Sequence, residues 1–198
     1  MDYDWIGAGS IPSKNYRCGY CGHDIASDKG YSAEFHFGGH RQYAHIAICH
    51  YCKNPTFLDG EGRQFPGAIY GKSVDNLPTD EMKALYDEAR KCVGFGAFNA
   101  AILTCRKLLM HVAVELGAPE NQTFLGYVDY LVDNHFVPSR AKGWVDHIRL
   151  KGNEATHQIV LMGIEDASNL VDFIEMILRT NFEYPAIAAP KTKNQLTP

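Results

Sequence analysis

The sequence has little excess charge of either sign. Its 198 residues include 19 Lys and Arg against 23 Asp and Glu, so the formal net charge is −4. This acidic balance excludes a bulk polycation, and any nucleic-acid binding must come from a local patch. Only 21% of the residues are charged and 45% are hydrophobic, which excludes an intrinsically disordered chain. The sequence therefore predicts a folded protein with a buried core.

Long apolar runs are also missing. No uninterrupted apolar stretch reaches the about 18 residues that a transmembrane helix needs. The first residues, 1–4, are acidic where a signal peptide would be basic. We expect no membrane partner and a cytoplasmic location. In that reducing compartment, the six cysteines are not expected to form a disulfide framework.

Four of these cysteines form two Cys-x-x-Cys pairs. The pairs are Cys18 with Cys21 and Cys49 with Cys52, and 27 residues separate them. Two residues between cysteines let one tight turn direct both thiolates at a single ion, and four thiolates complete a tetrahedral zinc site without an open position. We predict one structural zinc ion per chain. Gly22 suits such a turn, since the residue after the second ligand often needs a positive φ.

Other roles for the cysteines fit the pattern less well than a structural zinc site. A thioredoxin-like redox site needs one Cys-x-x-Cys in a βαβ setting, which the sequence does not show. A catalytic zinc would need an open position, and a histidine would become a ligand only if one cysteine were not used. The nearby histidines are His23, His36, His40, His45 and His50. Cys92 and Cys105 occupy apolar helix positions and are expected in the core.

The residues between the cysteine pairs predict a β-hairpin. Residues 31–37 alternate in period two, Gly38 and Gly39 offer a turn, and residues 43–48 are again extended. Aromatic and histidine side chains in this part could stack on nucleic-acid bases. However, residues 1–70 contain six Lys and Arg against seven Asp and Glu, and therefore no basic stripe. We expect an interaction module, with RNA or DNA binding as the second interpretation.

The second half of the chain predicts a helical bundle. Thr79 before Asp80 and Glu81 is typical of a helix N-cap followed by carboxylates in the first turn. Apolar spacing predicts helices over about 80–93, 98–116, 124–132, 138–148 and 165–178. The predicted fold class is α+β, a small β-rich zinc ribbon followed by an all-α bundle. The expected boundaries are 1–70 for the ribbon, 71–78 for a linker, 79–184 for the bundle and 185–198 for a flexible tail.

A row of polar side chains follows if the fourth predicted helix continues beyond residue 148. Arg149, Asn153 and His157 are spaced i, i+4 and i+8, so one helix face would present a cation, an amide and an imidazole. Such a row could hold a phosphate and move a proton. Gly152 costs a helix about 1 kcal/mol, which indicates close packing or a break at that point. The structural alternative is an ion pair for Arg149 and local hydrogen bonds for Asn153 and His157.

The run 148–157 resembles the Arg-x-x-Gly-Asn-x-Ala-x-His signature of the bacterial domain-of-unknown-function family numbered four-one-four-five. Residues 101–109 and 165–175 are similar to that family as well, and the resemblance covers roughly residues 79–184. It implies a HEPN-like bundle, often with an N-terminal zinc ribbon. HEPN bundles often dimerise and occur in toxin, anti-phage and restriction systems.

The resemblance also implies a candidate catalytic site. Active HEPN proteins cleave RNA without a metal: a His acts as general base or acid on the ribose 2′-hydroxyl, and an Arg stabilises charge on the phosphate. His157 matches this His, and Asn153 matches the Asn that accompanies the Arg. The Arg itself is displaced, because Gly152 stands before Asn153, so Arg149 or Lys151 would supply the cation. A Lys lacks the planar fork that holds a phosphate.

Two functions follow from these features. The first is a zinc-binding HEPN-like protein that serves as a non-catalytic interaction or nucleic-acid-binding component of a bacterial anti-phage or restriction system, with a defence-system protein as partner. The alternative is a metal-independent ribonuclease toxin or effector that uses His157 with Arg149 or Lys151. Apolar residues on more than one side of the second helix also predict a homodimer through the helical part. They are Phe98, Ile102, Leu103, Leu108, Leu109 and Val112.

Overall fold

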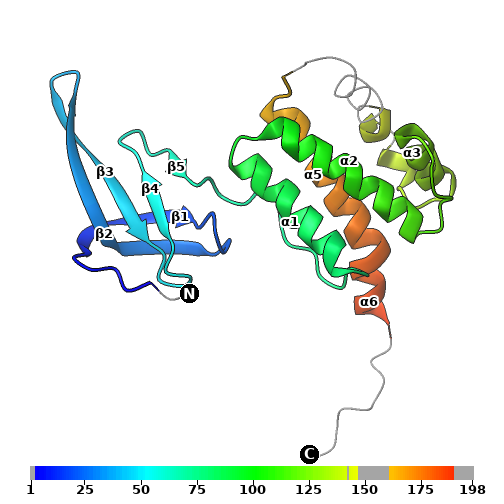
Figure 1. Cartoon of the computed structure of the whole chain (residues 1–198), viewed down its shortest axis with the longest axis horizontal. Helices are drawn as coiled ribbons and strands as arrows, with labels where there is room; N and C mark the ends of the chain where they lie inside the picture. The colour runs from blue at the N-terminus through cyan, green and yellow to red at the C-terminus, as the bar shows by residue number, and fades with distance from the viewer. Residues whose placement is uncertain (1–2, 142, 147–160, 190–198) are drawn as a thin grey trace, which may run out of the picture. The chain divides into compact units, whose positions relative to one another are not determined.

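The computed structural model describes residues 3–141, 143–146 and 161–189, and divides the chain into two compact units (Figure 1). The β unit contains the chain up to Tyr70 together with Arg90–Ala97. The helical unit contains Gly71–Ala89 and the chain from Phe98 onward. An antiparallel sheet is thus followed by helices, which confirms the predicted α+β class. None of the described helices is both long enough and apolar enough to span a membrane.

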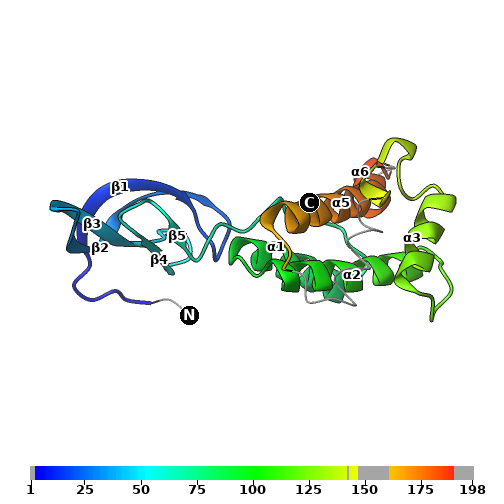
Figure 2. The ribbon, with the colours of Figure 1, turned by 90° about the horizontal axis from the view of Figure 1, so that it is seen from above.

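The β unit contains one five-stranded antiparallel sheet in the order β1-β2-β3-β4-β5. The strands are β1 (Gly9–Arg17), β2 (Asp24–Phe37), β3 (His40–Ile48), β4 (Pro55–Leu58) and β5 (Gln64–Phe65). Each strand lies beside its predecessor because short turns connect them. The register between β1 and β2 shifts between Ser10 and Lys14. Such a bulge bends a strand, and Figure 2 shows β1 curving along the sheet.

The predicted β-hairpin is confirmed by the pairing of β2 with β3. Their residues pair without interruption from Gly30 opposite Ala47 to Phe37 opposite His40. The turn between them has φ +60° at Gly38 and +79° at Gly39. A two-residue hairpin turn needs these left-handed conformations, which glycine adopts without a Cβ clash.

The β unit has a small buried core and an exposed apolar row. Seven side chains form the core: Ile11, Tyr16, Cys18, Ile25, Ala47, Cys49 and Leu58. Ile46 lies opposite Phe57, and Phe57 opposite Phe65, so a row of apolar side chains crosses three strands. Phe35 and Phe37 extend this row along β2, since alternate residues share a face. The five side chains are 37–68% exposed and are called the aromatic face below.

The first helix of the chain is α1 (Asp80–Gly94), whose N-cap is Thr79 as predicted, because the Met82 N–H donates to the Thr79 Oγ1 at 3.2 Å. The remaining elements are α2 (Phe98–Glu115), α3 (Phe124–Asp133), a 3-10 turn (Ser139–Ala141), α5 (Ile164–Leu178), a π-helical turn (Arg179–Glu183) and α6 (Tyr184–Ala188). The first, second, third and fifth predicted helices are confirmed. The fourth runs into residues 147–148, outside the described part of the chain.

Helix α2 packs against α3 and α5 and supplies much of the core. Its buried side chains are Ala101, Ile102, Cys105, Leu108, Leu109, Val112 and Ala113. Four of the six residues on which the helical homodimer was predicted are therefore covered within the chain itself. Of the other two, Leu103 is 55% exposed and Phe98 is half-buried. A helix that contacts two neighbours buries more than one side, so much less apolar surface is left for a second chain.

The segment predicted as a linker, 71–78, belongs to the helical unit. The Glu175 carboxylate on α5 accepts hydrogen bonds from the Lys72 backbone N–H at 3.0 Å and from the Tyr86 hydroxyl at 3.1 Å. The same hydroxyl lies 2.9 Å from the Lys72 carbonyl oxygen. These contacts hold the start of the segment between α1 and α5.

Arg179 extends this attachment along the helix. Its guanidinium donates to Glu175 at 2.9 Å, to Glu183, and to the Ser73 carbonyl oxygen at 2.8 Å. The buried Glu183 carboxylate in turn accepts from the Asp75 backbone N–H at 2.8 Å. Glu175, Arg179 and Glu183, spaced i, i+4 and i+8, therefore clamp residues 72–75 onto the helical unit.

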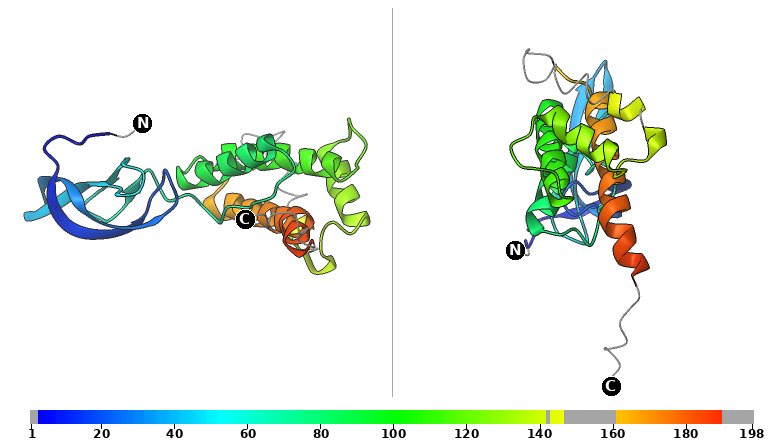
Figure 3. Two further views of the ribbon diagram at one scale, coloured as in Figure 1. Left: turned by 90° about the horizontal axis from the view of Figure 1, so that it is seen from below. Right: turned by 90° about the vertical axis from the view of Figure 1, so that its right-hand side faces the viewer.

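The predicted flexible tail begins at 185, but the helix continues to Ala188. Figure 3 shows α5, the π-helical turn and α6 as one continuous helix. Pro185 lies in the first turn of α6, where the missing N–H of proline is tolerated.

The clamp predicts a pH-dependent contribution to stability. Burial by itself would raise the pKa of Glu175, but hydrogen bonds from Lys72, Arg179 and Tyr86 outweigh it and hold this pKa below its ordinary value of 4.5. The contribution is therefore full above pH 4.5 and is lost as the pH falls through the lower, folded-state pKa. Glu175→Gln should lower the free energy of unfolding by about 1–3 kcal/mol at pH 7. Urea unfolding should show the difference shrinking below pH 4.5.

Glu115→Gln provides the matched control, because Glu115 is exposed at the end of α2. It should leave unfolding at pH 7 nearly unchanged. A Glu175→Gln protein as stable as the native chain at pH 7 would contradict the clamp.

Candidate metal centre

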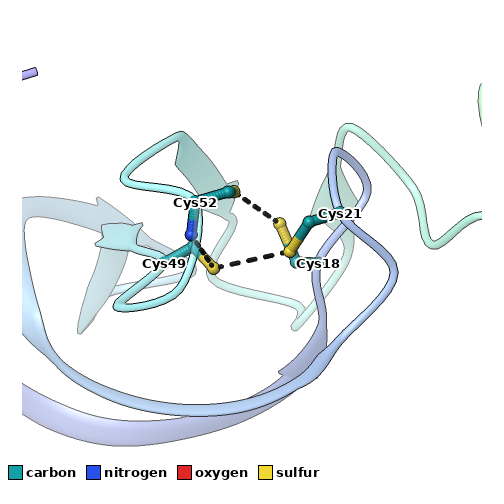
Figure 4. A group of neighbouring side chains, drawn as sticks. All are labelled: Cys18, Cys21, Cys49 and Cys52. Carbon is teal, nitrogen blue, oxygen red and sulfur yellow. Dashed lines mark hydrogen bonds between the residues drawn. The ribbon is translucent and has the colours of Figure 1, made fainter. Parts of the chain in front are cut away.

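Four cysteine sulfurs converge where the strands of the β unit end (Figure 4). Cys18 follows β1, Cys49 follows β3, and Cys21 and Cys52 lie in the turns that lead into the next strands. All four Sγ atoms lie within 4.8 Å of one another. The Sγ distances are 3.7 Å from Cys18 to Cys52 and 3.8 Å from Cys21 to Cys49. A tetrahedral site with zinc–sulfur bonds of about 2.3 Å has sulfur–sulfur edges of about 3.8 Å, so the four side chains fit such an ion.

The first Cys-x-x-Cys turn is built as the sequence predicts. The Cys18 N–H donates to the His23 carbonyl oxygen at 2.9 Å, and the Gly22 N–H donates to the Cys18 carbonyl oxygen at 2.9 Å. Gly22 has φ +72°. The expected positive φ after the second cysteine is therefore confirmed.

The second turn repeats this arrangement without a glycine. The Cys49 N–H donates to the Asn54 carbonyl oxygen at 3.0 Å, and the Lys53 N–H donates to the Cys49 carbonyl oxygen at 2.9 Å. Lys53 takes the place of Gly22 with φ +60°. This conformation costs a residue with a Cβ roughly 1–2 kcal/mol. The sequence offered one signal for it, the equal distance of Gly22 and Lys53 from the first cysteine of each pair.

Several donors surround the sulfurs. The Cys52 N–H lies 3.4 Å from the Cys49 Sγ, and the Asn54 side-chain amide lies 3.5 Å from the Cys52 Sγ. The rings of His23 and Tyr51 stack at 3.7 Å and connect one turn with the other. Sequence reasoning missed the roles of Asn54 and Tyr51, because neither residue type marks a metal site.

The surroundings give the thiols different acidities. Burial raises the pKa of Cys18. Burial also raises the pKa of Cys21, to about 12. Burial opposes ionisation of Cys52 as well, but hydrogen bonds from Asn54 outweigh it and lower the pKa of Cys52 to about 7. Cys52 therefore ionises most easily of the three. Cys18 and Cys21 would release their protons only when a cation binds. Metal affinity at such a site increases with pH.

The centre is closed. Cys18 and Cys49 are fully buried, and the cluster contains these four cysteines and no histidine among the residues the structure describes. Of the nearby histidines, His45 is buried and its Nδ1 lies 3.0 Å from the Ser32 hydroxyl oxygen, and burial lowers its pKa. Cys105 is buried in α2, as expected, and Cys92 is half-buried in α1. A catalytic metal with a histidine ligand therefore has no support in this geometry.

The polar row predicted as a catalytic site, Arg149, Lys151, Asn153 and His157, lies outside the described residues.

Comparison with known proteins finds a match for the helical part. No curated protein and no solved structure matches the chain. Residues 87–195 match the family described as domain of unknown function DUF4145, over more than half of the 198 residues. The match includes most of the region that resembled this family by its motifs. The chain belongs to the DUF4145 family.

Proposed function

We propose that this chain is a zinc-stabilised, non-catalytic binding component of a bacterial anti-phage or restriction system. The observation that carries the proposal is the closed four-cysteine centre, whose sulfurs satisfy a tetrahedral ion without an open position. An ion bound there would hold strand ends together and would offer no site for water or substrate. The β unit then acts through its surface.

Zinc is the ion that these ligands favour. Four thiolates at tetrahedral spacing select zinc or iron over hard cations such as magnesium and calcium. Cys18, Cys21, Cys49 and Cys52 would bind it as thiolates, and Asn54 would support Cys52 through its amide. The bound ion would supply structural cross-linking of the two turns.

The aromatic face is the surface that supports a binding role. Exposed apolar patches on a folded domain mark interaction sites. Beside this face, a hollow of about 270 Å³ is lined in part by Phe35, Phe37 and Phe57. A side chain from a partner protein could fill it.

Charge favours a protein partner over nucleic acid for this face. Arg63 at the rim of the hollow is paired with Asp59 at 2.6 Å and with Glu61 at 3.2 Å. Arg41 on the hairpin is paired with Glu34 at 3.0 Å. Both cations are therefore partly neutralised, and a phosphate backbone would have to displace carboxylates to reach them.

The defence context rests on the resemblance to HEPN proteins of anti-phage and restriction systems. Family membership and a helical unit in which α2 packs against α3 and α5 support a HEPN-like bundle. The same resemblance supports the alternative function, a metal-independent ribonuclease that uses His157 with Arg149 or Lys151. The displaced Arg favours the non-catalytic function, because Lys151 cannot replace a bidentate guanidinium.

Metal analysis tests the centre. The purified protein should contain one zinc ion per chain and little iron, as measured by elemental analysis. Cys49→Ser should lose the ion, because three thiolates leave the tetrahedron open, whereas the control Cys92→Ala should keep it. Chelation should disorder the sheet and spare the helical circular dichroism signal. Protein free of zinc, or a Cys49→Ser variant with full zinc content, would disprove the metal assignment.

An RNA cleavage assay decides between the two functions. Single-stranded RNA should remain intact with the native protein at micromolar concentration, because the Arg of the motif is displaced from its place before Asn153. His157→Ala should behave identically. Cleavage that leaves 2′,3′-cyclic phosphate ends and disappears in His157→Ala would instead establish the ribonuclease function.

Binding by the aromatic face has a separate test. Proteins encoded by neighbouring genes would be co-expressed with the native chain, and a complex should form with one of them. The double variant Phe57→Ser/Phe65→Ser should lose that complex while keeping its zinc. Tyr43→Ser, which removes an exposed aromatic ring from the opposite side of the same hairpin, is the control. Tight binding of single-stranded RNA or DNA that depends on Phe57 and Phe65 would show the partner class to be wrong.

A further inference from the structure

The outer edge of β2 is open over its second half. In the described chain, β2 has two neighbouring strands, β1 and β3, and its pairing with β1 extends only from Asp24 to Gly30. Pairing with β3 continues to Phe37. Figure 1 shows this part of β2 and β3 running beyond β1 as a two-stranded arm. One edge of residues 32–37 therefore lacks a strand partner within the described residues.

The side chains of residues 32–37 are exposed to solvent. Each of residues 32–37 is exposed, including Phe35 and Phe37. A two-stranded arm is marginally stable in water, and an unpaired strand edge is a template for another strand. A further strand along β2 would satisfy the backbone groups of the edge and extend the sheet.

The turn decides which residues direct their backbone groups outward. In a two-residue turn the flanking residues, Phe37 and His40, hydrogen-bond with each other. Along an antiparallel pair, residues that bond to one neighbour alternate with residues that face the other way. Phe35 and Phe37 therefore bond toward β3, whereas Ser32, Glu34 and His36 present their N–H and C=O groups to the open edge.

This alternation restricts how a second copy can pair. Two copies related by a twofold axis must place outward-facing residues opposite outward-facing residues. An axis at Glu34 would oppose two Glu34 carboxylates, and an axis at His36 would oppose two imidazoles. An axis at Phe35 opposes Glu34 of each copy with His36 of the other, twice. It also sets Phe35 against Phe35 on the aromatic face, in a non-hydrogen-bonded position where side chains lie closest.

We propose that two copies of this chain pair antiparallel through residues 32–37 of β2, centred on Phe35. The occupant of the edge is a second copy because the segment is complementary to itself. Glu34 meets His36 of the other copy on one face of the sheet, and the two Phe35 rings meet on the other face. Phe37 also meets Ala33 of the second copy, a large side chain against a small one. The two sheets become one, and their aromatic faces become continuous. This interface lies in the β unit and differs from the helical homodimer predicted from the sequence.

The mass in solution tests the proposal through a charge exchange. His36→Glu would set a new carboxylate against Glu34 at both ends of the interface, while keeping a favourable cross-strand neighbour in Arg41. Light scattering at micromolar concentration should give twice the chain mass of 22.1 kDa for the native protein. For His36→Glu it should give the mass of a single chain. The double variant Glu34→His/His36→Glu restores opposite partners and should restore the larger mass.

His40→Glu is the matched control, since His40 lies on β3 beside the turn and outside the proposed interface. It should keep the native mass, and all variants should keep the native metal content, which shows that the β unit is folded. A native protein of single-chain mass would overturn the proposal. So would a His36→Glu protein of unchanged mass, because association would then use another surface such as the helical unit.

Discussion

A five-stranded sheet whose buried core holds only seven side chains has too little apolar contact to keep its strand ends together. The convergence of four cysteine sulfurs supplies the missing constraint. Both Cys-x-x-Cys turns connect neighbouring strands, so one ion would fix the ends of β1 and β3 and the approach to β2 and β4. The register of the sheet, and with it the aromatic face and the open edge of β2, depends on those ends being held.

The metal centre and the hairpin could be predicted from sequence because their signals are local. Two cysteines three positions apart form one turn, and Gly38-Gly39 between alternating residues forms another. The aromatic face was not predicted, because its row depends on the register of Ile46, Phe57 and Phe65 across three strands. Lys53 was missed for a different reason. The closed turn forces its positive φ, against the preference of the residue type.

The helical half shows where periodicity reaches its limit. The apolar spacing predicted four helices correctly, but it does not show how many neighbours a helix has. Residues of α2 that α3 and α5 bury were therefore assigned to an interface with a second chain. The attachment of 72–75 was equally invisible, since Lys72 and Glu175 are 103 positions apart. A turn-rich composition indicates a loop, but it does not show whether distant side chains bind the backbone of that loop.

The spacing of the sulfurs also has a redox consequence. Cys18 and Cys52, like Cys21 and Cys49, approach each other from opposite turns. If the ion were lost under oxidising conditions, disulfides formed between these neighbours would join the same strand ends that the ion joins. The strand ends would then be joined by disulfide bonds, and the oxidised sulfurs could no longer bind the ion. A reductant during purification therefore preserves the capacity of this centre to be reloaded with metal.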